Sequence, residues 1–157
     1  STPLYSSAAS DVYKRQVGSS VMYFRTRIPR NVTLSYNGLA IAPVQAMING
    51  ALFEWVVENL LKNSLDALQG QGEIDVRISD DLEWVYIDVK DTGKGIPKSN
   101  FKRIFEPGFT TKTRGWGLGL SLSRRIIEEY HKGRIYVVDS EPGRGTTIRI
   151  ALKRLYA

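Results

Sequence analysis

Two pairs of alternating segments constrain the fold of this chain more than any other feature. The segments "EIDVRIS" (73–79) and "EWVYIDVK" (83–90) alternate apolar and polar residues on either side of the short turn "DDL". This is the pattern of a hairpin of two half-buried antiparallel strands. "RIYVVDS" (134–140) and "GTTIRIAL" (145–152) repeat it around the turn Glu141-Pro142-Gly143. Two such hairpins predict a mainly antiparallel sheet with one buried face.

The segments between these strands predict a second layer of helices. Residues 42–68 have a helical pattern with an irregular entry near Gly50. A second helix is expected over 118–131, ending at Lys132-Gly133 with the glycine just past the helix end. "NVTLSY" (31–36) alternates as a further strand. This order predicts an α+β fold, a two-layer α/β sandwich whose mixed, mainly antiparallel sheet has about five strands and about three helices on one face.

The first residues are expected to contribute little to this fold. Residues 1–20 are rich in serine and alanine and show no sustained hydrophobic period. We interpret them as a disordered or artificially added leader outside the folded domain. "VMYFRTRIPR" (21–30) predicts the end of an incoming helix or strand that stops before Pro29. The folded domain is therefore expected to span residues 31–157.

The composition excludes several classes of protein. The 157 residues suit one domain, and the lack of cysteine with a single histidine excludes disulfide frameworks and thiolate or histidine-rich metal sites. No apolar run approaches the roughly 20 residues of a membrane span. The net charge is +6, but the basic residues are scattered, which argues against a nucleic-acid-binding protein. These features fit a protein of the reducing cytoplasm.

One side of the helix in "LFEWVVENLLKNSLDAL" (52–68) carries Asn59, Asn63 and Asp66, because successive residues turn by about 100°. The opposite side carries the apolar core stripe, formed by Val57, Leu61, Leu65 and Leu68. The polar side could be a solvated face. However, asparagine is a poor helix former, and this side also carries apolar residues, namely Leu52, Trp55 and Val56. Amide and carboxylate oxygens on one helix face suit a hard cation such as Mg²⁺.

The loop "VKDTGKGIP" (89–97) leaves a strand with Asp91 at the strand end and Gly93 and Gly95 after it. These glycines are compatible with an ordinary loop that contains turns. The alternative is a binding loop, in which Asp91 accepts a hydrogen bond from an exocyclic amine. The glycines would then let a planar ring lie against the backbone.

Three alternate glycines, Gly115, Gly117 and Gly119, stand directly before the second helix. Glycine costs a helix about 1 kcal/mol relative to alanine, so the stretch indicates either a flexible loop or close approach by a ligand. The free N–H groups at the start of the helix suit a polyphosphate. The sequence "GWGLGL" lacks the ending of a P-loop and the spacing of a Rossmann fingerprint.

The segment between the two loops carries an aromatic residue at every fourth position, namely Phe101, Phe105 and Phe109. This spacing predicts a short helix that packs its aromatic rings on the core. It also fits a lid that docks through aromatic anchors while Lys112 and Arg114 reach anionic oxygens.

Together these segments resemble the ATP-binding domain of sensor histidine kinases, in the superfamily shared with type II topoisomerase subunits, mismatch-repair ATPases and a cytosolic chaperone. "ENLLKNSLDAL" looks like the N box, "DTGKGIP" the G1 box, "FKRIFEPGFTTK" the F box and "GWGLGL" the G2 box, and "GRGTTIRIAL" is similar to the closing strand motif. The motifs occur in the family's order over about residues 31–152. The resemblance implies a Bergerat-type sandwich with ATP and Mg²⁺ as cofactors.

The resemblance also implies roles for individual residues. Asn63 would coordinate Mg²⁺, Asn59 would support it and contact phosphate, and Lys112 would contact the γ-phosphate; these three are the expected catalytic residues. Asp91 would hydrogen-bond the adenine amine. The other residues expected at the nucleotide are Asp66, Gly93, Gly95, Ile96, Phe105, Gly115, Gly117, Leu118, Gly119, Leu120 and Thr146. Among them, the three alternate glycines would form the hinge of the lid, with the two leucines anchoring it, and the threonine would complete the adenine end.

The resemblance further favours phosphoryl transfer over hydrolysis. The hydrolytic members of the superfamily carry a glutamate four residues before the metal asparagine, as base for a water. Here that position is Asn59, and Glu58 lies about 100° away around the helix. A site without a base for water favours transfer to another acceptor, as in histidine kinases.

The acceptor of such a transfer is not expected within this chain. The single histidine, His131, precedes Lys-Gly at a helix end, and we interpret it as a surface or capping histidine. The resemblance then implies a catalytic module, with residues 21–30 as the remnant of a linker to a dimerisation and phosphoacceptor domain. The expected partners are ATP, that domain and a response-regulator receiver domain, without nucleic acid or membrane contact. The expected location is the cytoplasm, alone or as the cytoplasmic part of a membrane-anchored sensor.

Two other functions are compatible with the sequence. An anti-sigma-type protein-serine kinase of the same superfamily has a similar ATP site. A non-catalytic interaction module would keep the fold without the reaction. Nucleotide titration separates the second from a kinase, because only a functional site would bind Mg·ATP.

Overall fold

The computed structural model describes residues 12–38, 45–46, 48–109 and 118–155. Its strands are β1 (Val32–Asn37), β2 (Gln45–Ala46), β3 (Gly72–Asp80), β4 (Trp84–Asp91), β5 (Arg134–Glu141) and β6 (Gly145–Leu155). They form one sheet in the order β1-β3-β4-β6-β2, and β5 also pairs with β6. β1 is parallel to β3, and the other pairs are antiparallel. The five longer strands confirm the predicted mixed, mainly antiparallel sheet.

Both predicted hairpins are present. In the first, Ile78 of β3 lies opposite Ile87 of β4, so the buried residues of the two strands share one face. In the second, the N–H of Arg144 donates to the carbonyl of Glu141 at 2.9 Å and closes the turn. The alternating pattern therefore predicts both strand pairs correctly, because each strand has one buried and one open face.

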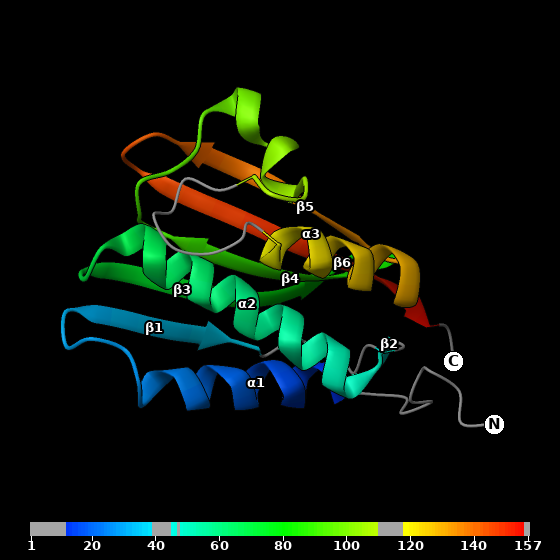
Figure 1. The fold of residues 1–157 in the computed structure, drawn as a ribbon. Coiled ribbons are helices and arrows are strands. Elements are labelled where there is room, and N and C mark those ends of the chain that lie inside the picture. Colours follow the sequence, from blue (N-terminus) through cyan, green and yellow to red (C-terminus); the bar gives the residue numbers. More distant parts are fainter. Residues whose placement is uncertain (1–11, 39–44, 47, 110–117, 156–157) are drawn as a thin grey trace.

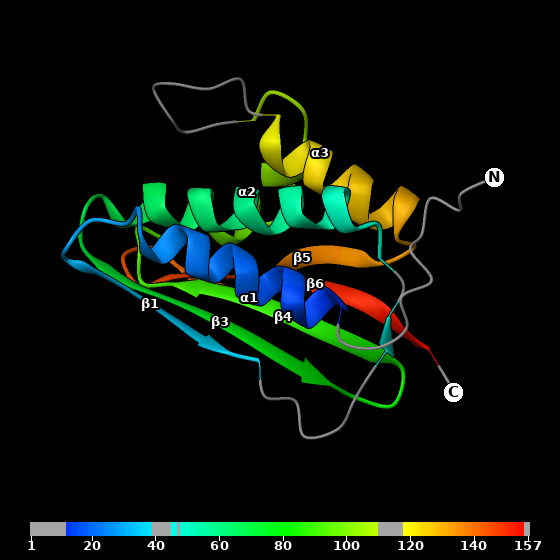
Figure 2. The ribbon, with the colours of Figure 1, turned by 90° about the horizontal axis from the view of Figure 1, so that it is seen from below.

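In the described part of the chain, three α-helices cover one face of the sheet, namely α1 (Val12–Arg25), α2 (Gly50–Leu68) and α3 (Gly119–Arg125). Figure 1 shows α2 and α3 in front of the strands and α1 beside β1, and Figure 2 shows the three helices on the same side of the sheet. This arrangement confirms the two-layer sandwich. Shorter turns follow, namely η1 (Lys98–Asn100), η2 (Arg103–Phe105) and the π-helical η3 (Ile126–Tyr130). No helix in the described ranges is long and apolar enough to cross a membrane.

The core lies between the helices and the sheet. From α2 it receives residues of the predicted stripe and its flanks, namely Phe53, Val57, Leu60, Leu61 and Leu68. The sheet contributes alternate residues of its central strands, namely Ile74, Val76, Ile87, Val89, Ile150 and Leu152. Leu65 is partly buried and packs against this core. The period of each element therefore decides which of its residues are buried.

The prediction that residues 1–20 lie outside the fold is wrong for residues 12–20, because α1 is part of the core. Tyr13, Val17, Val21 and Phe24 recur at helical spacing and are at most 6% exposed. This stripe begins inside the serine- and alanine-rich segment and continues beyond residue 20. The domain boundary predicted at residue 20 therefore falls within one helix. Residues 1–11 lie outside the described part of the chain.

The helix predicted from residue 42 begins only at Gly50. Before it, β2 pairs with the end of β6. Asn49 starts the helix, because its backbone is extended and its Oδ1 accepts the N–H of Leu52 at 3.2 Å. The apolar pattern runs through this boundary, and only the capping side chain marks it.

The end of the second predicted helix also differs from the expectation. The helix continues as the π-helical η3, in which the N–H of His131 donates to the carbonyl of Ile126 at 3.1 Å. The left-handed residue is Lys132, with a φ of 53°. Gly133 is needed for another reason, since a Cβ there would lie 2.4 Å from the carbonyl oxygen of Ala151.

His131 is buried, so the surface alternative of its interpretation is wrong, whereas the capping alternative is the one that the structure supports. The residue is 6% exposed. Its Nε2 accepts the N–H of Asn49 at 2.9 Å, and its Nδ1 lies 3.0 Å from the carbonyl oxygen of Ile126. A neutral ring with the proton on Nδ1 satisfies both contacts. The histidine therefore joins the end of the α3–η3 helix to the start of α2.

We expect this histidine to make the fold less stable in mild acid. Burial lowers the pKa of His131 in the folded state, so the unfolded chain takes up a proton first as the pH falls. The stability that depends on the neutral ring is fully present above the unfolded pKa and is lost as the pH falls through the folded pKa. Urea unfolding measured from about pH 7.5 to about pH 5.5 would show this loss. The variant His131→Gln should lose this part of the pH dependence; equal pH slopes in both proteins would contradict the prediction.

Candidate functional site

A buried carboxylate, Asp91, lies at the end of β4 and is 5% exposed. Its Oδ1 accepts the N–H of Gly93 at 2.9 Å, and it also has hydrogen bonds with the side chain of Ser64 on α2 and the backbone of Thr146 on β6. Burial raises the pKa of Asp91, and the three hydrogen bonds oppose this shift because they favour the charged form. Asp91 therefore connects the helix layer, the sheet and the loop after β4.

The loop after β4 is held against two neighbouring backbones. The N–H of Lys94 donates to the carbonyl of Ala67 near the end of α2 at 3.1 Å. A Cβ at Gly93 would lie 2.6 Å from that carbonyl oxygen, and a Cβ at Gly95 would lie 2.0 Å from the carbonyl oxygen of Glu141. The contacts of this loop with α2 and with the β5–β6 turn therefore require both glycines. Their role in shaping a base pocket stays a prediction.

Thr146 and Ile96 lie close together, as the predicted adenine end requires. The N–H of Ile96 donates to Ser140 Oγ at 2.8 Å, and this oxygen lies 2.8 Å from Thr146 Oγ1. Thr146 also pairs with Asp91 across β4 and β6. The structure thus brings three predicted residues from separate elements to one end of the sheet.

The predicted polar side of α2 lies between solvent and α3. Asn59 and Asn63 are half-buried, whereas Asp66 is exposed. Asn59 Nδ2 donates to Ser123 Oγ on α3 at 3.1 Å. Asn63 directly precedes Ser64 in α2, and Ser64 has a hydrogen bond with Asp91. The role of Asn63 as a metal ligand stays a prediction.

The start of α3 packs directly on this asparagine face. Gly119 is the first residue of α3, and a Cβ there would lie 2.6 Å from Asn59 Oδ1. Leu120 packs against the core, whereas Leu118 is 47% exposed. Their role as anchors of a lid stays a prediction. The other predicted residues of this segment, Lys112, Gly115 and Gly117, lie outside the described residues.

The phenylalanine-bearing segment packs on the core. Phe105 in η2 is 4% exposed, and Phe101 and Phe109 pack partly buried against the same cluster. This confirms the interpretation of the repeat as core aromatics. A contact between Phe105 and a nucleotide stays a prediction.

Among the described residues, four further ones contact the predicted site residues and are not identified from the sequence, namely Ser64, Ser123, Ser140 and Gly145. Ser64 lies four residues after buried Leu60, so the helical period could have indicated a buried hydroxyl on α2. Gly145 has a φ of 121°, and a Cβ there would lie 1.9 Å from the carbonyl oxygen of Asp91. This contact depends on the pairing of β6 with β4, which no local pattern reveals.

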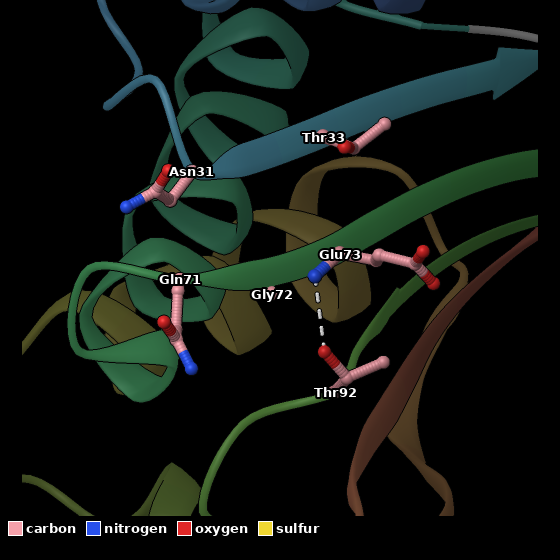
Figure 3. A pocket seen from close by; sticks show the side chains of 6 residues that line it. All are labelled: Asn31, Thr33, Gln71, Gly72, Glu73 and Thr92. Carbon is pink, nitrogen blue, oxygen red and sulfur yellow. Dashed lines mark hydrogen bonds between the residues drawn. The ribbon is translucent and has the colours of Figure 1, made fainter.

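Two surface cavities border these strands. The larger, of about 520 Å³, lies where β1 and β3 begin, and Figure 3 shows its lining residues, including Thr33, Glu73 and Thr92, with helices behind the strands. The smaller, of about 210 Å³, includes Asp91 and Thr146 in its lining. Of the two, only the smaller one reaches residues of the candidate site.

The donor groups fit a nucleotide with a hard cation. A buried carboxylate suits an amine donor, and amide oxygens are ligands that Mg²⁺ accepts together with water and phosphate oxygens. Within the described ranges, no group of three histidine, cysteine, aspartate or glutamate residues could hold a metal ion.

These features define a nucleotide-binding α/β sandwich: a helix with an asparagine face, a glycine loop after a strand and a buried carboxylate between them. Residues 49–155 match the family described as "Histidine kinase-, DNA gyrase B-, and HSP90-like ATPase". The chain belongs to this family.

The relatives of the chain include proteins named as kinases. It is 43% identical to sporulation kinase A of Bacillus subtilis over 61% of its own length, and 33% identical to nitrogen regulation protein NtrY of Azorhizobium caulinodans over 90%. The chain spans 16% and 18% of the lengths of these relatives. The similarity therefore concerns one domain of much longer proteins.

Solved structures show the same fold. The catalytic domain of histidine kinase ThkA superposes with a TM-score of 0.81 at 25% identity, with 95% of each chain covered. The mycobacterial sensor histidine kinase MprB superposes with a TM-score of 0.77 at 23% identity, with 92% of this chain and 95% of that chain covered. The fold is that of a histidine-kinase catalytic domain.

Proposed function

We propose that this chain is the ATP-binding catalytic domain of a two-component sensor histidine kinase. It binds Mg·ATP and transfers the γ-phosphoryl group to a histidine on a separate dimerisation domain, for onward transfer to a response regulator. The family and the relatives named as sensor kinases support this function. The observation that carries it is the buried carboxylate of Asp91 at the end of β4, between the glycine loop and α2.

Asp91 is proposed to select adenine. An ionised carboxylate only accepts hydrogen bonds, and it has more acceptor positions than the three donors around it occupy. The exocyclic amine of adenine is a donor and suits this buried acceptor. A base with a carbonyl at the same position would place two acceptors face to face without water, which costs free energy. The site should therefore prefer ATP to GTP.

Asn63 is proposed to bind Mg²⁺, with Asn59 in support. When bound, Mg²⁺ would neutralise the negative charge on the phosphoryl group during transfer. Both side chains are neutral, so they orient the cation without reducing its charge. Asp66 is exposed on the same face of α2, and we propose that it lies at the nucleotide beside the two asparagines.

The same helix face argues for transfer rather than hydrolysis. A general base must accept a proton from the attacking water, and an asparagine amide cannot do so. The Nδ2 of Asn59 is moreover engaged with Ser123 Oγ. We therefore propose that the nucleophile is supplied by another domain.

The acceptor histidine is proposed to lie on that separate domain. His131 is the single histidine of the chain, and its two ring nitrogens are engaged with Asn49 and Ile126 in the core. One solved structure contains histidine kinase ThkA in complex with a response regulator protein. By analogy we propose a receiver domain as the downstream partner, and the cytoplasm, where ATP is available, as the location.

The variant Asn63→Ala tests the proposed site. Wild-type protein should bind Mg·ATP, and the variant should bind it roughly 10- to 100-fold more weakly, because an interaction with a charged group is worth about 1.5–3 kcal/mol. Calorimetric titration with and without Mg²⁺ measures both affinities. Binding of metal-free nucleotide should change little, since Asn63 is assigned to the cation.

Two results would overturn this proposal. Equal Mg·ATP affinities in wild type and Asn63→Ala would remove the metal assignment. Incubation of the isolated chain with labelled ATP should give no acid-labile phosphohistidine, and its appearance would show that the chain contains its own acceptor.

A further inference from the structure

Ser123 is a polar residue in a fully buried position at the interface of α3 with α2. It is 0% exposed. Its hydroxyl donates to the carbonyl of Gly119, four residues earlier in α3, at 2.8 Å. This is a common bond of a helical serine. Since a hydroxyl has one proton, Ser123 Oγ has only acceptor positions left for any other neighbour.

This proton count fixes the orientation of the Asn59 side chain. The neighbour of Ser123 Oγ is Asn59 Nδ2, at 3.1 Å. An asparagine amide can present either its NH₂ group or its carbonyl oxygen to a partner. Only the NH₂ group can donate to an oxygen whose proton is already engaged. Ser123 therefore leaves Asn59 Oδ1 as the acceptor atom available for other contacts.

Gly119 restricts the same amide from a second side. A Cβ at Gly119 would lie 2.6 Å from Asn59 Oδ1 and 3.1 Å from its Nδ2. Gly119 is not among the residues with a positive φ, so its backbone conformation alone does not require glycine. The contact with Asn59 does. The start of α3 thus holds this side chain between the Ser123 hydroxyl and the Gly119 backbone.

We infer that Ser123 is a positioning residue that orients Asn59 for the metal and phosphate side of the site. It acts through Asn59 and does not itself touch the nucleotide. The inference rests on the proposed function, in which Asn59 supports the cation and contacts phosphate. Because Ser123 donates to Gly119, the same hydrogen bonds connect the asparagine face of α2 to the first residue of α3.

The variant Ser123→Ala tests this inference. It should weaken Mg·ATP binding roughly two- to tenfold, the range of one neutral hydrogen bond. Adenosine contacts only the proposed adenine end at Asp91, so its affinity should not change. A merely structural role of Ser123 would lower both affinities together, and such a result would overturn the inference.

Two controls sharpen the test. Ser121 lies on the same helix, and its Oγ donates to the Leu118 carbonyl at 3.0 Å. Ser121→Ala should therefore leave the ratio of Mg·ATP to adenosine affinity unchanged. Ser123→Thr keeps the hydroxyl and should have the same ratio of affinities as the wild-type protein.

A double variant tests whether Ser123 acts through Asn59. In the Asn59→Ala background, Ser123→Ala should have no further effect on Mg·ATP affinity; additive losses would contradict action through Asn59.

A measurement without nucleotide tests the orientation of Asn59 by Ser123 separately from the proposed function in ATP binding. The side-chain NH₂ signals of Asn59 in a ¹H–¹⁵N NMR spectrum should shift in Ser123→Ala and not in Ser121→Ala. Unchanged Asn59 signals would refute the orientation by Ser123. If the signals shift but wild-type protein fails to bind Mg·ATP, the proposed function fails while the contact between the two side chains stands.

Discussion

Asp91→Asn is expected to abolish measurable Mg·ATP binding without unfolding the protein. The substitution preserves size but replaces an acceptor by an amide whose NH₂ group can face the adenine amine. Loss of a hydrogen bond to a charged group costs about 1.5–3 kcal/mol, and an unpaired buried donor adds to this cost. Affinity should therefore fall by at least about 100-fold. Calorimetric titration of both proteins with Mg·ATP measures the difference.

The stability of this variant should not fall with its affinity. Burial raises the pKa of Asp91 in the folded state above its unfolded value, so folding favours the protonated carboxyl. The corresponding stability is fully present below the unfolded pKa and is lost as the pH rises through the folded pKa. At neutral pH the buried charge therefore costs stability. We expect Asp91→Asn to keep or raise the thermal midpoint, measured by circular dichroism.

Asp139→Asn is the matched control for this prediction. Asp139 lies on β5 and lines the same small cavity as Asp91, but it is exposed and pairs with Thr147 of β6. Its replacement changes the net charge equally and should leave Mg·ATP affinity within about twofold, as expected for a surface substitution. Equal losses in the two variants would show that charge, and not a contact of Asp91, governs binding.

Gly95→Ala is expected to destabilise the protein by roughly 2–5 kcal/mol. Gly95 has a φ of 72°, and a Cβ there would lie 2.0 Å from the carbonyl oxygen of Glu141. The left-handed conformation costs alanine about 1–2 kcal/mol, and forcing a group into a packed contact costs about 1–3 kcal/mol more. Urea unfolding gives the free energy of unfolding. Nucleotide affinity should fall too, because the loop that carries Gly93 must move.

Gly143→Ala separates the two contributions. Gly143 has a φ of 83°, but a Cβ there would meet no described atom within 4 Å. This variant should therefore lose only the conformational part, about 1–2 kcal/mol. If both variants lose the same free energy, the contact of the loop with the β5–β6 turn does not require a glycine at position 95.

The elements of the fold could be predicted because their signals are local. Alternation over 73–79 and 83–90 describes strands with one buried face, and the structure contains β3 and β4 there. The wrong predictions concern the limits of elements. They occur where a hydrophobic pattern continues across the true or the predicted limit of a helix. The α1 stripe from Tyr13 to Phe24 crosses the expected end of the leader, and the pattern before α2 continues through the Asn49 cap.

The sequence predicts that a group lies close to the glycines, but it does not identify that group. Alternate glycines before α3 and after β4 indicate that something approaches the backbone closely. In the structure the groups that approach belong to the protein itself: Asn59 Oδ1 lies against Gly119, and the carbonyls of Ala67 and Glu141 lie against Gly93 and Gly95. A contact with phosphate or adenine would come in addition to these contacts.

The sequence by itself determined the type and order of the elements, the position of Asp91 at a strand end and the asparagine face of α2. These features depend on hydrophobic period and residue type within short windows. Only the tertiary structure decided which amide atom of Asn59 is engaged, because its partner Ser123 is 64 residues away. The Asp91 environment likewise needs Ser64 and Thr146, which lie on different elements. Such contacts depend on how the layers pack, and packing joins residues that no local pattern connects.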